Sequence, residues 1–322
     1  MQGWRTGLAA AALLLLAAAA WAGPPRRYEP ISPIPAPPPE NPARVALGRQ
    51  LFLDPLLSRD GSVSCGSCHN LAMAGIDGLP HAIGIGGAEE PVNTPTVYNA
   101  ALNLAQFWDG RADSLEEQAG GPVTNPREMG SRWPEVIARL EHSPYRAAFQ
   151  RIDGGPPTPR RVEEAIASFE RTLLTPDSPF DRWLKGDDSA ISPEAAQGYA
   201  LFKSYGCSSC HQGANVGGNM FQRFGFYGHP LSQPPHPADL GRYAITGQPD
   251  DRYVFKVPSL RLAVLTPPYF HDGSVPDLAT AIRLMGRYQL GRAIPDGDIT
   301  LIIRFLDTLP GNMTADDGGP RP

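Results

Sequence analysis

Cysteine is scarce in this chain of 322 residues, which contains only four of them. All four fall within two short motifs, Cys65–His69 (CGSCH) and Cys207–His211 (CSSCH). No cysteine therefore remains outside the motifs to form a structural disulfide bond, and any covalent role of cysteine belongs to these two places.

The sequence also lacks three patterns that would indicate other classes of protein. The formal net charge is only −5, which predicts no basic surface for binding nucleic acid. No segment after the N-terminus is apolar enough to span a bilayer, so the mature chain is expected to be soluble. No run alternates apolar and polar residues in the manner of a β-sheet, which favours an all-α fold.

Each cysteine motif has the spacing C-x-x-C-H that attaches a c-type haem. Two thiols at this spacing reach the two vinyl groups of one porphyrin, and the histidine that follows binds the iron. The alternatives are a zinc site and a thioredoxin-like redox pair. Zinc favours C-x-x-C elements that lie closer together, and a redox pair needs neither the histidine nor a second copy. The sequence therefore predicts two c-type haems, one held by Cys65, Cys68 and His69 and the other by Cys207, Cys210 and His211.

The N-terminal segment Met1–Ala22 has the composition of a secretory signal peptide. It carries one basic residue, Arg5, ahead of an apolar run, and it ends in the small-x-small sequence AWA. Export agrees with c-type haem attachment, which takes place outside the bacterial cytoplasm. The segment predicts a periplasmic protein, with a retained membrane anchor as the alternative. The proline-dense segment Gly23–Ala43 is expected to be an extended leader without a packed core.

The rest of the chain predicts two helical domains of similar construction. The 36 prolines and 34 glycines favour helices joined by long ordered loops. Apolar residues recur at helical spacing in Pro42–Leu53, Pro134–Phe149, Arg160–Leu174, Pro193–Tyr205, Pro276–Met285 and Asp296–Leu309. One haem motif follows such a segment in each half. We therefore expect an N-terminal haem domain at 44–180 and a C-terminal haem domain at 181–322, joined near Pro176–Ser192.

Longer motifs run in order along the mature chain between Arg44 and Leu309. They are the extended first haem motif CGSCHNL, then NTPTVYN (Asn93–Asn99), QFWDGRA (Gln106–Ala112), TPPYFHDGS (Thr266–Ser274) and MGRYQLG (Met285–Gly291). Together they resemble the bacterial dihaem cytochrome c peroxidase family. The resemblance implies two cytochrome-c-like domains, with hydrogen peroxide reduced at the N-terminal haem. It also implies that electrons enter through the C-terminal haem from a small periplasmic cytochrome c or copper protein.

The resemblance also assigns the residues that control each iron. Met285 matches the family's axial methionine, and His/Met ligation keeps water and peroxide off an electron-transfer haem. Met129 lies at a plausible ligand distance along the chain from His69, but its neighbours Glu128 and Gln118 match the family's active-site loop. Glu128 is the candidate acid–base group for the peroxide proton, and Gln118 is the candidate partner that holds the substrate. Without the resemblance, both would be interpreted as ordinary exposed side chains.

Five further residues are matched in the same way. Trp108 resembles a tryptophan that lies between the two haems and shortens the electron path, with packing at the domain interface as the alternative. His271 resembles a residue near the haem interface that donates a hydrogen bond to a propionate. Asn93, Thr266 and Pro268 match a calcium site in which an amide oxygen and two backbone carbonyls are ligands. The family also implies a homodimer.

One departure from the family pattern changes the expected mechanism. Many members carry a histidine in the loop after the first haem motif, which caps the peroxidatic iron until the other haem is reduced. Here the loop Ala82–Gly87 has Ile85 at that position. Isoleucine cannot bind iron, and His81 lies four positions upstream behind Pro80, which limits its freedom. We therefore expect a first haem that is open at rest and needs no reductive activation.

The sequence thus predicts an all-α periplasmic dihaem peroxidase that reduces hydrogen peroxide to water with electrons from a small redox protein. Two alternatives remain. One is a dihaem enzyme that oxidises tryptophans on a partner protein, a branch with a tyrosine where this chain has Met285. The other is a dihaem electron-transfer cytochrome, which requires a strong sixth ligand on both irons.

Overall fold

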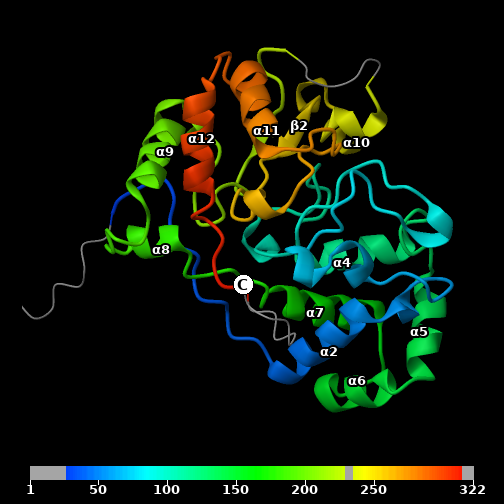
Figure 1. Cartoon of the computed structure of the whole chain (residues 1–322). Helices are drawn as coiled ribbons and strands as arrows, with labels where there is room; N and C mark the ends of the chain where they lie inside the picture. The colour runs from blue at the N-terminus through cyan, green and yellow to red at the C-terminus, as the bar shows by residue number, and fades with distance from the viewer. Residues whose placement is uncertain (1–26, 229–234, 314–322) are drawn as a thin grey trace, which may run out of the picture.

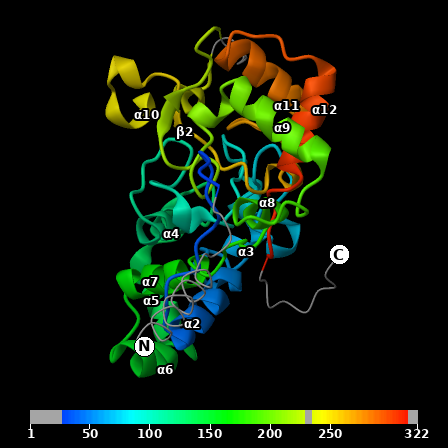
Figure 2. The same cartoon turned by 90° about the vertical axis from the view of Figure 1, so that its left-hand side faces the viewer.

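The fold has two helical halves, which Figures 1 and 2 show one above the other. The computed structural model describes residues 27–228 and 235–313, so the predicted signal peptide Met1–Ala22 lies outside the described residues. In Figure 1 most of the N-terminal half lies below and the C-terminal half above. Among the described helices, none is long and apolar enough to cross a membrane.

A pair of crossed helices, α2 (Pro42–Leu53) and α7 (Pro159–Glu170), lies at the centre of the N-terminal half. Each begins with a polar cap followed by proline, which is preorganised for the first helical turn. The Asn41 side chain accepts a hydrogen bond from the amide of Ala43, and Thr158 caps α7 in the same way. The other helices of this half are α3 (Cys65–Cys68), α4 (Leu115–Thr124), α5 (Trp133–Glu141) and α6 (Tyr145–Asp153).

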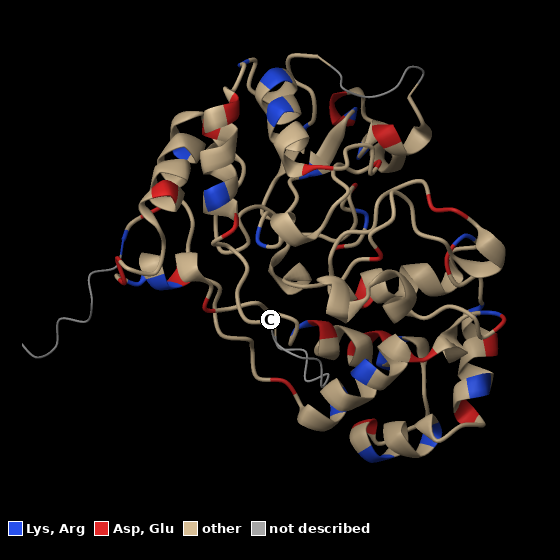
Figure 3. Ribbon diagram, viewed as in Figure 1, with Lys and Arg blue, Asp and Glu red and all other residues tan. Residues whose placement is uncertain are grey.

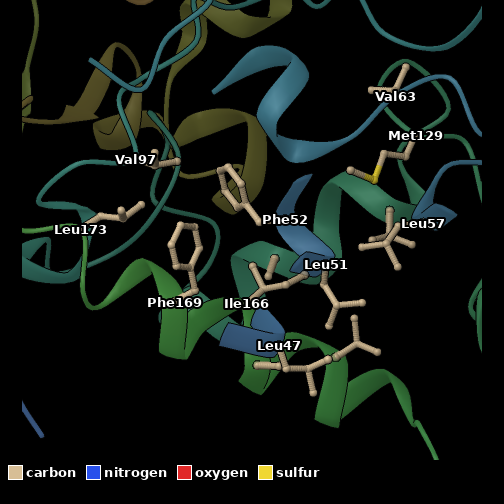
Figure 4. Packing of buried hydrophobic residues seen from close by; sticks show 14 of the residues in the cluster. Leu47, Leu51, Phe52, Leu57, Val63, Val97, Met129, Ile166, Phe169 and Leu173 are labelled. Carbon is tan, nitrogen blue, oxygen red and sulfur yellow. The ribbon is translucent and has the colours of Figure 1, made fainter. Parts of the chain in front are cut away.

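Close approach of α2 and α7 depends on Gly48. A Cβ atom at this position would lie 1.8 Å from the carbonyl oxygen of Ala165, so any other residue would force the helices apart. One turn further along, the rings of Phe52 and Phe169 pack edge to face with centroids 5.4 Å apart. Figure 4 shows both rings within the buried cluster that also contains Leu47, Leu51, Ile166 and Met129.

The C-terminal half repeats this crossing with α9 (Pro193–Ser204) and α12 (Asp296–Leu306). A Cβ atom at Gly198 would lie 1.9 Å from the carbonyl oxygen of Leu301. The rings of Phe202 and Phe305 are 5.2 Å apart. The two crossings therefore correspond residue by residue: Gly48 with Gly198, Phe52 with Phe202, Ala165 with Leu301, and Phe169 with Phe305.

The remaining elements of the C-terminal half are short. They comprise α8 (Pro179–Leu184), α10 (Tyr243–Thr246), α11 (Leu278–Leu284) with a π-helical turn after it (Met285–Gln289), and the antiparallel strands β1 (Phe221–Arg223) and β2 (Val254–Lys256). This short ribbon departs from the predicted all-α fold. A mainly helical chain is confirmed, whereas the division into two cytochrome-c-like domains stays a prediction.

The predicted helix Pro134–Phe149 was wrong as a single element. It is divided between α5, which ends at Glu141, and α6, for which Pro144 is the N-cap. Proline has no amide hydrogen to donate to the preceding turn, so α5 ends before it and α6 begins after it. The other predicted helices form with ends that differ by a few residues, and α2 has the predicted bounds.

The segment Gly23–Ala43 was predicted to be an extended leader without a packed core. This prediction was wrong for its described part, which packs on the C-terminal half. Ile31 is only 1% exposed and belongs to the apolar core there, with a β-bridge to Gly213. The Arg261 guanidinium donates a hydrogen bond of 2.8 Å to the carbonyl oxygen of Ser32. The segment therefore joins the two halves along one side of the molecule, as the blue trace in Figure 1 shows.

A buried ion pair fixes α8 in the predicted junction Pro176–Ser192. Arg261 donates to the Asp181 carboxylate at 2.8 Å, and both side chains are fully buried. A buried charge is costly unless it is paired, so loss of either partner would destabilise this contact. Elsewhere Figure 3 shows acidic and basic residues interspersed over both halves.

Candidate active site

The first haem motif lies at one wall of a pocket in the N-terminal half. Helix α3 holds Cys65 and Cys68, and His69 follows at its end, where its amide donates to the carbonyl oxygen of Cys65. The His69 Nδ1 atom is 3.2 Å from the carbonyl oxygen of Gly75. Since a carbonyl only accepts, Nδ1 carries the proton and Nε2 has a free lone pair, as an iron ligand requires. Burial lowers the pKa of His69, which favours the neutral ring.

The second haem motif lies in a larger cavity of about 280 Å³, which is lined mostly by the C-terminal half. Cys207, Cys210 and His211 line this cavity, and Met285 lines it from the π-helical turn after α11. Burial lowers the pKa of His211 to about 4, so its ring is neutral. Its Nδ1 atom is buried without a hydrogen-bond partner among the described residues. Two thiols, a neutral imidazole and a thioether in one apolar cavity fit the donor set of a c-type haem.

The two candidate catalytic residues both line the first pocket. Gln118 lies on α4 and Glu128 on the loop that follows this helix. Met129 lines the same pocket but is packed in the core of the N-terminal half with Val63 and Leu57, as Figure 4 shows. The structure thus places a carboxyl and an amide beside the first motif, and a methionine thioether beside the second.

The Glu128 carboxyl is held by Asn125, which ends α4. The side-chain amide nitrogen of Asn125 donates to the carboxyl of Glu128 at 2.6 Å and to that of Glu90 at 3.2 Å. Burial, together with the nearby charge of Glu90, raises the pKa of Glu128 to about 7. A carboxyl with this pKa can both accept and return a proton near neutral pH, as an acid–base group must.

The sequence analysis missed three residues of this site, namely Glu90, Asn125 and Glu170. Glu90 arrives from a distant loop, so no local pattern marks it. Asn125 lies three positions before Glu128, a spacing that suits a hydrogen bond at a helix end but is common elsewhere. Glu170 stands one helical turn after the buried Ile166, and a charged residue in the apolar register of a helix is a signal that could have been noticed.

The loop after the first motif keeps Ile85 close to Glu128. The amide of Ile85 donates to the carbonyl oxygen of Glu128 at 2.8 Å, and its side chain is buried in the core of the N-terminal half. His81 does not line the first pocket, and its Nδ1 atom lies 3.0 Å from the carboxylate of Glu89 at the surface. The structure therefore places a hydrogen bond to Glu89 at the surface for His81 and a buried apolar side chain at Ile85.

Trp108 belongs to the N-terminal half but lines the cavity of the second motif. Its indole nitrogen donates to the carbonyl oxygen of Asn93 at 2.9 Å, and its ring lies 6.4 Å from that of His271. His271 is buried in the same cavity wall, with Nε2 at 2.9 Å from the Asp239 carboxylate. In this structure, the partner of the His271 ring is thus a carboxylate of the chain itself.

The three candidate calcium ligands belong to this same cavity. Asn93, Thr266 and Pro268 all line the second cavity. The side-chain nitrogen of Asn93 donates to the carbonyl oxygens of Leu79 and Pro80, which turns its oxygen away from them. No group of three His, Cys, Asp or Glu side chains suited to a metal occurs among the described residues. A cation here would have to use amide and backbone oxygens, the hard ligands that Ca²⁺ accepts.

Comparison with known proteins finds a matching family model and several similar relatives. The family model described as Di-haem cytochrome c peroxidase matches residues 42–189. Cytochrome c551 peroxidase of Nitrosomonas europaea is 47% identical over 289 residues, which cover 88% of this chain and 85% of the relative. Cytochrome c peroxidase Ccp of Escherichia coli is 45% identical over 90% of this chain, which spans 63% of the length of that relative.

A solved structure extends the similarity to the fold. The crystal structure of a MauG-like protein associated with microbial copper homeostasis superimposes with a TM-score of 0.75 and 27% sequence identity. The match covers 90% of this chain and 95% of that protein. The similarity therefore includes both helical halves.

Proposed function

This chain belongs to the di-haem cytochrome c peroxidase family, and we propose that it reduces hydrogen peroxide to water in the bacterial periplasm with electrons from a small cytochrome c or copper protein. Membership makes the chain an oxidoreductase of the peroxidase class that carries two c-type haems. The observation that carries the proposal is the difference between the two pockets. The first offers a carboxyl and an amide beside its histidine, and its own methionine, Met129, is packed in the core; the second offers Met285.

Each haem would be held by the residues of its own motif. Cys65 and Cys68 would form the thioether links of the first, with His69 on the iron, and Cys207, Cys210 and His211 would do the same for the second. When bound, the haem irons supply one-electron storage and, at the first site, a place for peroxide to bind. Met285 would occupy the remaining position on the second iron, which restricts that site to electron transfer.

The side chains of the first pocket would manage the protons. Reduction of peroxide breaks the O–O bond and consumes two electrons and two protons to form two waters. Glu128 would accept the proton from one peroxide oxygen and return it to the other, while the Gln118 amide holds the substrate by a hydrogen bond. Asn125 would keep the Glu128 carboxyl in place. Trp108, between the halves, would shorten the path of the electrons from the second site.

A calcium ion and a second copy of the chain complete the proposal. The side-chain oxygen of Asn93, which accepts no hydrogen bond from another described residue, and the backbone oxygens of Thr266 and Pro268 would bind Ca²⁺. This site would join a loop of the N-terminal half to the wall that carries His271. The homodimer rests on the family resemblance alone.

The similarity to a MauG-like structure gives a second candidate activity, the oxidation of a partner protein. That branch carries a tyrosine at the position of Met285, so the methionine in the second cavity favours the peroxidase. A pure electron-transfer cytochrome would need a strong ligand beside the first motif as well. The first pocket presents Glu128 and Gln118 there.

We expect the fully oxidised enzyme to reduce peroxide at once, with no activating pre-reduction. Ile85 has no atom that can bind iron, and His81 is engaged with Glu89 at the surface. The test mixes oxidised or pre-reduced enzyme with peroxide and a reduced small cytochrome c, and compares the initial rates. Equal rates without a lag are expected. A lag that only pre-reduction removes, and that His81→Ala abolishes, would mean that His81 caps the first haem.

A further inference from the structure

Glu170 is a buried carboxyl that the proposed mechanism leaves unused. It is the last residue of α7, only 4% exposed, and it lines the first pocket together with Cys65 and Glu128. Its carboxyl makes no hydrogen bond or ion pair with another described residue. Burying an unpaired carboxyl is costly, so a fold under no other demand would place an apolar residue here.

The C-terminal half has such an apolar residue at the equivalent position. The helix crossings align Ala165 with Leu301 and Phe169 with Phe305, so the next residues, Glu170 and Leu306, correspond. Leu306 lines the second cavity as Glu170 lines the first. The helix crossing itself therefore needs no carboxyl at this position. Of the two sites, only the first has a carboxyl at this position of the crossing.

The surroundings of Glu170 favour proton binding over a fixed negative charge. Burial raises its pKa to about 8, and Glu116 on α4 acts in the same direction. Arg171 opposes this weakly, because its guanidinium pairs with Glu116 and lies near Glu40. The other ionisable groups that line the pocket are Glu128, His69 and the two cysteines that would become thioethers.

We propose that Glu170 is a redox-linked proton site, which binds one proton from water whenever the first haem accepts one electron from the donor protein. The inference rests on the proposed function, because it requires a haem in the first pocket. An added electron makes the pocket more negative by one charge, which favours the protonated carboxyl beside it. The donor protein is oxidised, the first site is reduced, and the net charge of the pocket stays constant.

This role differs from that of Glu128. Glu128 moves the substrate's own proton from one oxygen to the other. It therefore supplies neither of the two protons that the overall reaction consumes. Reduction of peroxide to two waters consumes two further protons, and the proton stored on Glu170 is one of them. The pocket would then hold a proton carrier, Glu128, on the loop after α4 and a proton store, Glu170, on α7.

The test measures the reduction potential of each haem against pH in the enzyme that carries both haems. For the unmodified enzyme, the potential of the first haem should fall as pH rises above about 8, where the Glu170 carboxyl of the oxidised enzyme has lost its proton, by up to about 59 mV per pH unit if one proton accompanies one electron. Glu170→Gln and Glu170→Leu should remove most of this slope, the latter by copying Leu306. Glu163→Gln, a half-buried neighbour on α7 outside the pocket, is the matched control and should keep the slope.

A slope that is unchanged in both Glu170 variants would overturn the inference while leaving the peroxidase proposal intact. An unmodified enzyme without a haem on the first motif would instead overturn the proposed function. If neither variant binds haem, the infrared difference spectrum of the unmodified enzyme decides. At a pH above about 8, reduction should add absorption from a protonated carboxyl, and a spectrum without that gain would contradict the proton site.

Discussion

Replacement of both Cys65 and Cys68 by alanine should remove one covalently bound haem and reduce peroxide turnover to background. The two thiols belong to the first and last residues of α3, and the other two cysteines of the chain lie in the second motif. His69 alone cannot hold a haem covalently. Haem content is measured by covalent haem stain after denaturing electrophoresis and by the mass of the intact protein.

The matching variant Cys207→Ala with Cys210→Ala is the control. It should lose the other haem and keep the first, so the protein would still react with peroxide but would accept electrons from the donor poorly. An unmodified protein that carries zinc or a single haem would contradict the interpretation of both motifs. So would a Cys65 and Cys68 variant that keeps its turnover.

Glu128→Gln should lower turnover by about 10²-fold or more while both haems stay bound, because the amide keeps the shape of the side chain but cannot accept the peroxide proton. The pH profile gives a second readout. Burial and the charge of Glu90 raise the pKa of Glu128 to about 7, so the base form accumulates as pH rises through this value. Turnover of the unmodified enzyme should therefore rise with pH to a plateau above about pH 7, and the variant should lack this rise.

Glu90→Gln is the matched control for this prediction. It removes the negative charge that raises the pKa of Glu128 but leaves the hydrogen bond from Asn125. The rise in turnover should move to lower pH, with a plateau close to that of the unmodified enzyme. If Glu128→Gln turns over at nearly the original rate, Glu128 is an ordinary loop glutamate.

Local signals in the sequence predicted the parts of the fold that depend on local interactions. The Asn41-Pro42 start of α2 and its apolar face were sufficient to locate that helix. The helix predicted across Pro144 failed because the apolar period was given more weight than a proline that ends it. The β1–β2 ribbon and the packing of Ile31 depend on partners far along the chain, which no local pattern reveals.

The candidate site divides in a similar way. The haem motifs were evident from the residues, because covalent attachment demands a fixed local spacing. Gln118 and Glu128 were identified through the family resemblance, since a single glutamine and a single glutamate carry no pattern. Asn125, Glu90 and Glu170 join them only after folding, when a helix end, a loop and the crossing helix meet in one pocket.

The electron-spin resonance spectrum of the purified, fully oxidised protein tests the central claim most directly. The proposed peroxidase has one iron with an open position in the first pocket and one iron bound by both His211 and Met285 in the second. One high-spin and one low-spin haem in equal amounts are therefore expected, with the high-spin signal lost on addition of cyanide. Two low-spin haems in the oxidised protein, unaffected by cyanide, would contradict an open peroxidatic site.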